Sequence, residues 1–256
     1  LTVHMASQNP HEVRRRCADL LGIDEARVQA IQKDVGGGFG QKMFMGREEV
    51  ATVLASHHLG RPVKWIEDRR ENLMAANIAR IEKATVTFAL DADGQLLATQ
   101  LDHLDDAGAY GSSSGALVGM LLTGPYRAQR SVWKTETVFT NTVGRAAYRG
   151  PWQMESVARE QMVDHVCREI GVDPLEWRRR NAVTWDDLPY TNPMGMTYDI
   201  VTPLECLEQA AAMIDYHAAR AEQQRAFDEE GRLLGIGIGL YVEPSAQNVA
   251  TMNTEG

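Results

Sequence analysis

The feature that most constrains the fold is the run Gly36-Gly37-Gly38-Phe39-Gly40, which lies between two segments of different periodicity. Residues 28–35 before the run favour a strand, and residues 48–59 after it favour a helix that Gly60 and Pro62 end. Glycine adopts positive φ without a steric penalty and lets a ligand approach the backbone closely. Consecutive amide groups in such a turn can hold an anionic or carbonyl oxygen. The run therefore predicts a strand, a glycine turn and a helix, with the turn as a candidate ligand site.

Two nucleotide-binding loops fit this run poorly. A P-loop needs a Gly-Lys pair followed by Ser or Thr, but Lys42 does not directly follow a glycine and Met43 comes after it. A Rossmann pattern fails because the sixth position, counted from Gly36 or from Gly38, holds no glycine. From the residues alone, a strained structural turn and a ligand-binding turn remain open, with Phe39 either in the core or as a lid beside the ligand.

Strand-like and helical patterns are mixed along the whole chain, which predicts an α+β (mixed α/β) fold. Helices are predicted at 10–21, at 48–59, at 156–170, from Asp173-Pro174 onward and at about 203–225. Strands are predicted at 28–35, 62–67, 84–90, 95–104, 131–140 and 233–242, with a hairpin turn at 91–94. Residues 105–125 are rich in Gly and Ser and are expected to form a loop. The polar, proline-containing stretch 184–193 is the best candidate for a domain boundary.

Composition and charge argue against several classes of protein. A formal net charge of −9 and a pI near 5.3 disfavour a general nucleic-acid binder, which carries a basic face for phosphates. The arginine clusters at 14–16 and 178–180 lie in predicted helices and are expected to be solvated or interface-facing stripes. The chain contains no apolar stretch of about 18 residues and no signal-peptide pattern, so neither a membrane span nor a secretion signal is supported.

The three cysteines are far apart and form no CxxC pair, which fits neither a disulfide framework nor an iron–sulfur or zinc site. We expect buried thiols and a cytoplasmic protein; the residues are Cys17, Cys167 and Cys206. No histidine lies in a ligand pattern such as HExxH, so no side chain is predicted to bind a metal. Because the chain opens on Leu1 in mid-pattern and stops after a strand-like run, we expect an excerpt from a longer protein.

Residues 34–42 resemble the Gly-Gly-Phe-Gly loop of molybdenum hydroxylase large subunits, the family that contains xanthine dehydrogenase, aldehyde oxidase and carbon monoxide dehydrogenase. Upstream, residues 7–11 are similar to the family segment whose glutamine, here Gln8, contacts the metal centre, and the 32-residue separation (40 − 8) agrees with the family. Further similar runs lie at 59–73, 147–150 and 173–181. Several motifs in the right order make the resemblance span nearly all of the chain.

This resemblance implies a partial molybdopterin-binding fold, with a first domain over 1–183 and the start of a second over 184–256. It also implies a molybdenum–molybdopterin cofactor, with the cytosine dinucleotide form as one option, and iron–sulfur and FAD groups only on partner subunits or domains. The implied reaction is hydroxylation of an aldehyde or an N-heterocycle with water as the oxygen source. Electrons would leave through the iron–sulfur and FAD subunits of the same complex, and neither nucleic acid nor membrane is an expected partner.

Site residues follow from the same resemblance. The residues implied to bind the cofactor are Gln8, Gly37, Gly38, Phe39, Gly40 and Arg149. Gln8 and Arg149 are also implied in catalysis. For Arg149, the physical reason is that a guanidinium can stabilise negative charge that develops on a substrate. An alternative for Arg149 is a structural salt bridge to a carboxylate such as Glu155. The family's general base matches no position here, so no catalytic glutamate is predicted.

Departures from the family pattern narrow the expectations. Gly150 stands where copper-containing carbon monoxide dehydrogenases carry a cysteine, and Met43 stands where xanthine dehydrogenases carry a glutamate. Oxidation of carbon monoxide and recognition of purines are therefore not expected. Trp152 is either a flat wall for an aromatic substrate or a core residue. The alternative for the whole chain is a non-catalytic, truncated module for cofactor binding or interaction.

Overall fold

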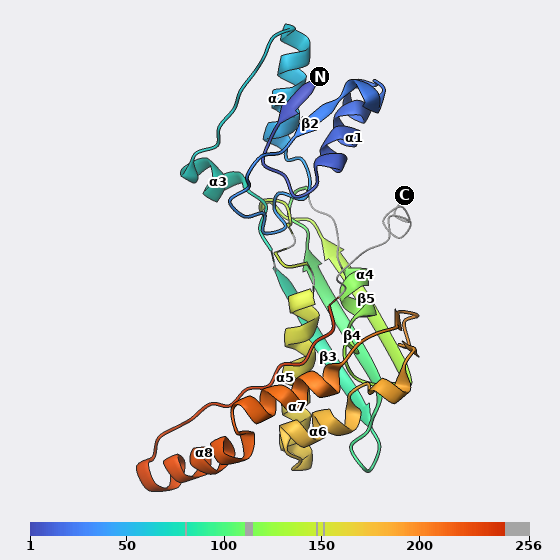
Figure 1. The fold of residues 1–256 in the computed structure, drawn as a ribbon, viewed down its shortest axis with the longest axis vertical. Coiled ribbons are helices and arrows are strands. Elements are labelled where there is room, and N and C mark those ends of the chain that lie inside the picture. The colour runs from blue at the N-terminus through green and yellow to red at the C-terminus, as the bar shows by residue number, and fades with distance from the viewer. Residues whose placement is uncertain (80, 111–114, 147, 151, 244–256) are drawn as a thin grey trace. The chain divides into compact units, whose positions relative to one another are not determined.

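The structure is a computed structural model, and it describes residues 1–79, 81–110, 115–146, 148–150 and 152–243 (Figure 1). The chain divides into two compact units, each built from three segments. Unit 1 comprises Leu1–Ile81, Asp106–Ser113 and Thr137–Pro151, and unit 2 comprises Glu82–Asp105, Ser114–Glu136 and Trp152–Gly256. The predicted boundary between family domains at 183/184 stays a prediction.

Unit 1 contains a parallel pair of short strands with helices packed on it. Its elements are β1 (Thr2–His4), α1 (Pro10–Leu21), η1 (Glu25–Arg27), β2 (Gln29–Ile31), α2 (Arg47–Leu59) and α3 (Arg69–Ala75). Asn9 caps α1 by accepting the N–H of Glu12, and Gly22 ends the helix at φ 62°. A buried cluster holds the unit together; it consists of Val13, Cys17, Ala18, Val28 and Val53. The helices predicted at 10–21 and 48–59 are confirmed, and the strand predicted at 28–35 is shorter.

In unit 1, one predicted strand is absent and one helix was not predicted. The strand predicted at 62–67 is not formed, because in the described residues its backbone pairs with no neighbouring strand. The helix α3 was not predicted from the sequence. Its start is marked by a reciprocal capping box, in which the Asp68 side chain accepts the Glu71 N–H and the Glu71 side chain accepts the Asp68 N–H. That Asp-x-x-Glu spacing was the signal available in the sequence.

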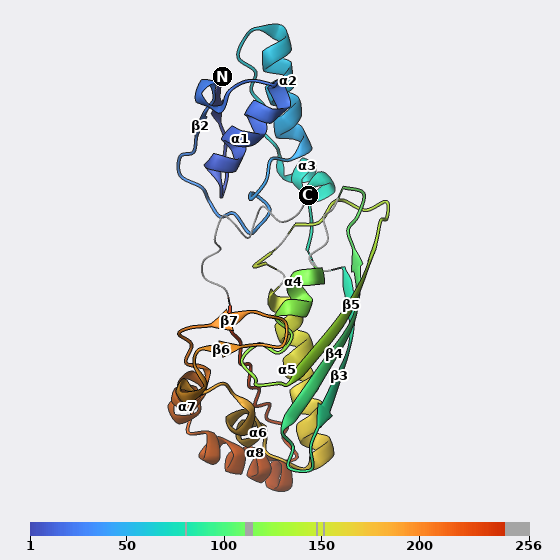
Figure 2. The ribbon, with the colours of Figure 1, turned by 90° about the vertical axis from the view of Figure 1, so that its right-hand side faces the viewer.

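Unit 2 is a three-stranded sheet with helices on one face (Figure 2). The strands are β3 (Glu82–Leu90), β4 (Leu96–Asp106) and β5 (Arg130–Val138), in the order β3-β4-β5, and β3 pairs with β4 antiparallel. α5 (Trp152–Ile170) runs along the sheet beside β3. Partly buried and exposed residues alternate strictly along β3, so only one face of this strand is covered. The predicted hairpin and the strand at 131–140 are thereby confirmed.

The remaining elements of unit 2 are short helices and a small hairpin. They are α4 (Gly115–Met120), α6 (Pro174–Asn181), η2 (Trp185–Asp187), β6 (Tyr190–Thr191), β7 (Thr197–Tyr198), α7 (Pro203–Met213) and α8 (Tyr216–Glu230). Asp173 caps α6 by accepting the N–H groups of Leu175 and Glu176, as predicted from the Asp-Pro pair. The mixed α+β fold predicted from the sequence is confirmed.

Three predictions for unit 2 are corrected. The loop expected at 105–125 contains α4, whose Gly119 lies so close to Trp133 that a Cβ would clash with the indole ring. The helix expected at 203–225 is two helices, because Asp215 adopts φ 46° and its side chain caps α8. The strand expected at 233–242 joins no sheet among the described residues; buried side chains bind its backbone instead.

Candidate functional site

The glycine loop of unit 1 has a backbone that only a few residue types adopt readily. Gly37 and Gly40 have φ values of 104° and 73°, and Phe39 between them has φ 56°. For a bulky residue, the left-handed region costs about 1–2 kcal/mol. Phe39 is 61% exposed, so burial of its ring offsets little of this cost. Backbone strain at an exposed position points to a constraint set by function.

Gln8 lies directly against this loop. A Cβ built on Gly38 would overlap the Gln8 side chain, with the amide Oε1 only 2.6 Å away. Two hydrogen bonds join the segment of Gln8 to the end of the loop. The backbone N–H of Gln8 donates to the Lys42 carbonyl at 2.8 Å, and the buried Ser7 hydroxyl donates to the same oxygen at 3.4 Å. A larger residue at position 38 would therefore displace the exposed side chain of Gln8 from its place against the loop.

The loop carries N–H groups that the rest of the described chain does not use. Two turn bonds close it, from the Lys42 N–H to the Gly38 carbonyl at 3.2 Å and from the Met43 N–H to the Gly40 carbonyl at 3.3 Å. Among the residues that the structure describes, no acceptor binds the N–H groups of residues 36–41. These donors are available to a ligand or to water.

A second segment of unit 1 reaches the loop through an aromatic contact. The ring of Tyr148 stacks on that of Phe39, with centroids 6.0 Å apart and planes inclined by 30°. Arg149 follows Tyr148 directly, is exposed, and has φ 57°. Gln8, the glycine loop and the turn at 148–150 thus come together in one unit, although 140 residues (148 − 8) separate their ends in the sequence.

The predictions from the sequence also named Trp152 and Glu155. The Trp152 side chain lies outside the described residues, so its role as a substrate wall stays a prediction. Glu155, the alternative partner considered for Arg149, forms a buried ion pair with Arg159 on α5. Of the cysteines, Cys17 and Cys167 are buried as expected, whereas Cys206 is exposed.

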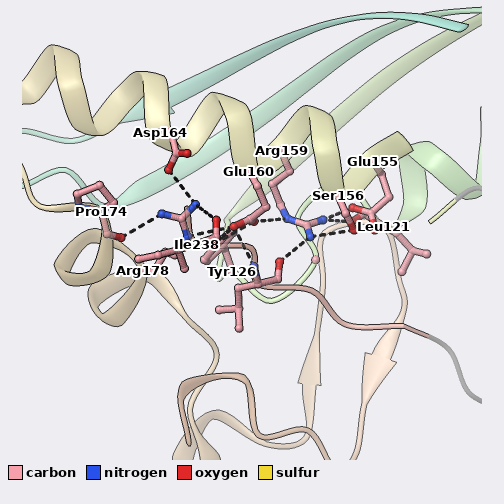
Figure 3. Close-up of polar contacts among 12 residues, drawn as sticks. Leu121, Tyr126, Glu155, Ser156, Arg159, Glu160, Asp164, Pro174, Arg178 and Ile238 are labelled. Carbon is pink, nitrogen blue, oxygen red and sulfur yellow. Dashed lines mark hydrogen bonds and ion pairs between the residues drawn. The ribbon is translucent and has the colours of Figure 1, made fainter. Parts of the chain in front are cut away.

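Unit 2 contains a buried charge network that was not predicted from the sequence (Figure 3). Arg159 and Arg178 are both fully buried and share the carboxylate of Glu160, each with an N–O distance of 3.0 Å. Arg178 also binds Asp164 at 3.0 Å, and the Tyr126 hydroxyl donates to Glu160 at 3.0 Å. The prediction that Arg178 belongs to a solvated or interface-facing stripe is therefore wrong. The reason is that α6 turns this side chain toward α5.

This network also fixes the segment before residue 243. Arg178 donates to the Ile238 carbonyl and Arg159 to the Leu240 carbonyl, both at 2.9 Å, while the Leu240 N–H donates to Glu160 at 3.0 Å. Burial raises the pKa of Glu155 to about 7, although Arg159 and Ser156 act in the opposite direction. The signal available in the sequence was Glu155, Arg159, Glu160 and Asp164 at helical spacing on α5.

The model of the molybdopterin cofactor-binding domain family matches residues 1–182. The chain belongs to this family, and the family that the sequence motifs indicated is confirmed. The fold of a partial molybdopterin-binding domain and the molybdopterin cofactor are confirmed with it. No helix in the described part of the chain combines the length and hydropathy needed to cross a bilayer.

Known relatives are large subunits of oxidoreductases. The chain is 36% identical over 264 residues to the nicotine 6-hydroxylase large subunit of Paenarthrobacter nicotinovorans. This alignment covers 100% of this chain and 32% of that protein. It is 33% identical to the carbon monoxide dehydrogenase large chain of Hydrogenophaga pseudoflava, covering 95% and 32% respectively. Among solved structures, quinoline 2-oxidoreductase from Pseudomonas putida 86 matches with a TM-score of 0.80 and 35% identity, over 89% of this chain and 30% of that one. The chain therefore spans about a third of the length of these relatives.

The loop geometry fits such a cofactor. A molybdopterin presents oxygen and sulfur atoms that accept hydrogen bonds, and the loop offers a row of N–H donors without acceptors among the described residues. The space that a Cβ would take is filled by the Phe39 ring at Gly37 and by the Gln8 side chain at Gly38, and the Gln8 amide adds a further donor beside the loop. The donor set is neutral, apart from the guanidinium of Arg149 in the adjoining turn.

Proposed function

We propose that this chain is the cofactor-holding part of the large subunit of a molybdenum hydroxylase that hydroxylates an N-heterocycle or an aldehyde with water as the oxygen source. The observation that carries the proposal is the contact of Gln8 with Gly38 beside a row of available N–H groups. When bound, the molybdenum cofactor supplies the redox chemistry and the site of oxygen transfer. The protein supplies binding, orientation and electrostatics.

In this proposal, the backbone of Gly37, Gly38, Phe39 and Gly40 and the side chain of Gln8 hold the cofactor. Hydrogen bonds from these groups orient it, and the strained loop keeps the donors in place before the ligand arrives. Arg149 lies in the turn next to the loop, where its permanent charge would stabilise an anionic group on the substrate. We propose no general base within this chain.

Among the substrate classes, we favour an N-heterocycle. Two of the relatives carry the names of nitrogen heterocycles, nicotine and quinoline. We further propose iron–sulfur and FAD subunits as partners and the cytosine dinucleotide form of the pterin. We also propose a cytoplasmic location, which the free thiols support. The domain division at 183/184 belongs to the same proposal, and its first part corresponds to the matched residues 1–182.

The test is metal and pterin analysis of the complete large subunit, purified with its partner subunits from cells that make the cofactor. We expect about one molybdenum and one pterin per large subunit, and turnover of N-heterocycles in preference to aldehydes. A matured preparation without molybdenum, while a known family member prepared in parallel contains it, would overturn the enzyme proposal. That result would favour the non-catalytic module.

Arg149→Lys tests the proposed role of the guanidinium. Lysine keeps the positive charge but lacks the planar fork of donors, so we expect kcat/KM to fall about tenfold to a hundredfold with molybdenum content unchanged. Arg47→Lys, in the same unit but bound to the Ala75 carbonyl, is the matched control and should behave as the wild type. Equal kinetics of the wild type and Arg149→Lys would remove Arg149 from the proposed site.

A further inference from the structure

Tyr148 contacts the glycine loop but is not among the residues proposed to hold the cofactor or to act on the substrate. Tyr148 is 49% exposed, and its ring stacks on that of Phe39, which is 61% exposed, at 6.0 Å between centroids. The two residues come from segments of unit 1 that are 109 positions apart (148 − 39). A contact between two largely exposed rings gains little from burial, so its value lies in geometry.

Phe39 depends on such contacts because its backbone is strained. The residue sits at φ 56°, a conformation that persists only where the surroundings favour it. On the loop itself, the ring lies over Gly37, where a Cβ would approach the ring carbon Cε2 to 2.5 Å. The Phe39 ring therefore has two contacts that define its position, the bare backbone of Gly37 and the face of Tyr148.

We propose that Tyr148 is a positioning residue: its ring holds Phe39 and thereby keeps the N–H groups of the loop oriented for the cofactor. This inference rests on the proposed function of the loop. The same contact places the following turn, in which Arg149 and Gly150 have φ values of 57° and 60°. Tyr148 thus connects the loop that holds the cofactor to the turn that carries Arg149.

Three variants of the complete large subunit, purified with its partners, test the inference. Tyr148→Ala removes the ring, Tyr148→Phe keeps the ring without the hydroxyl, and Tyr110→Ala is a matched control. Tyr110 is a 66% exposed tyrosine of the same unit whose ring lies against Arg47 instead, at 4.4 Å from the guanidinium carbon. The readouts are the molybdenum retained after extended dialysis and the Mo(V) electron paramagnetic resonance spectrum of the dithionite-reduced protein.

For Tyr148→Ala, we expect molybdenum to be lost about two- to tenfold faster, the range that corresponds to one aromatic pair, together with an altered Mo(V) spectrum. Tyr148→Phe and Tyr110→Ala should match the wild type in both readouts. Wild-type behaviour of Tyr148→Ala would overturn the inference. A defect in Tyr148→Phe as large as in Tyr148→Ala would also overturn it, since the hydroxyl would then be the important group.

A double-mutant cycle tests whether Tyr148 acts through Phe39. If it does, Tyr148→Ala should add little to the defect of Phe39→Ala, because the ring that Tyr148 holds is already absent. Additive defects would assign Tyr148 a separate structural role and overturn the inference. The thermal unfolding midpoint of each variant, compared with that of Tyr110→Ala, identifies a general loss of stability.

A readout without metal separates this inference from the proposed function. Hydrogen exchange of the Lys42 and Met43 amides reports on the two turn bonds that close the loop. Faster exchange in Tyr148→Ala, but not in Tyr148→Phe, would support the positioning role even in protein that contains no molybdenum. Unchanged exchange in both variants would overturn the role, whatever the metal analysis of the wild type shows.

Discussion

Three neighbouring residues of the glycine loop meet different steric demands. Gly37 accepts positive φ and leaves room for the Phe39 ring, whereas Gly38 leaves room for Gln8. Gly36 has neither demand, since a Cβ there would meet nothing within 4 Å and its φ is not in the left-handed region. A run of three glycines in the sequence therefore contains one position that a larger residue can occupy.

Alanine substitutions at Gly36 and at Gly38 should therefore have different effects. Gly38→Ala should displace the Gln8 side chain and reduce the molybdenum content of the matured protein about two- to tenfold, because the cofactor loses a hydrogen bond worth about 0.5–1.5 kcal/mol. Gly36→Ala should retain the metal. Molybdenum analysis of both variants checks this, and equal metal contents would show that the contact between Gln8 and Gly38 is unimportant.

At the level of elements, the buried charges on α5 and α6 replace a strand pairing. The segment that contains Ile238 and Leu240 has the composition of a strand, but in the described residues its backbone is bound by Arg159, Glu160 and Arg178. Removing one partner of a buried ion pair leaves the other charge without compensation. The network should therefore contribute strongly to the stability of unit 2.

Arg159→Ala tests that contribution. The substitution leaves Glu155 and Glu160 with less compensation inside the protein, so the free energy of unfolding should fall by about 3–5 kcal/mol. Arg225→Ala is the matched control, because Arg225 pairs with three glutamates on the exposed face of α8 and should contribute little. Denaturant unfolding measures both, and similar losses in the two variants would contradict the distinction between buried and exposed pairs.

The raised pKa of Glu155 predicts a pH dependence. Because burial raises its pKa to about 7 in the folded protein, the folded state binds more protons than the unfolded state between about pH 4.5 and pH 7. The stability that Glu155 contributes is complete below this window and is lost as the pH rises through 7, by up to about 3 kcal/mol.

Glu155→Gln cannot titrate, so its free energy of unfolding relative to the wild type should increase between pH 5 and pH 8. Denaturant unfolding of both proteins at several pH values checks the sign. Curves that stay parallel, or a wild type that gains on the variant as the pH rises, would show that the carboxylate is charged in the folded protein throughout this range.

For the whole molecule, the two compact units have separate hydrophobic clusters. Val13 is fully buried in the cluster of unit 1, and Val163 is fully buried in a cluster of unit 2 whose members all belong to that unit. Each unit therefore has its own source of apolar stabilisation. The effect of a cavity should be largest in the unit that contains it.

Val13→Ala and Val163→Ala form a reciprocal pair. Each removes buried methyl groups at a fully buried position and should cost about 2 kcal/mol locally. We expect hydrogen exchange to accelerate in α1 and α2 for the first variant and in α5 for the second. Acceleration spread evenly over both units in either variant would show that they unfold together.

Local sequence determined the elements whose signals lie within a few residues. α1 ends at Gly22, α6 begins after Asp173, and an Asp-Ala-Asp-Gly turn joins β3 to β4, all as the pattern predicts. The glycine turn was recognisable for the same reason, since five consecutive residues define it, whereas the role of Gln8 came from the resemblance to a family. Caps, turns and periodicity act between neighbours in the chain, so the chain itself displays them.

Tertiary structure alone decided features that depend on distant residues. It turned Arg178 inward to meet Glu160, held the segment at Leu240 by side chains, and brought Tyr148 to Phe39. A run of arginines looks the same in sequence whether it faces water or a buried carboxylate, and a strand-like segment looks the same with or without a partner. Each outcome depends on which surface a residue meets after folding, and periodicity along the chain does not specify that surface.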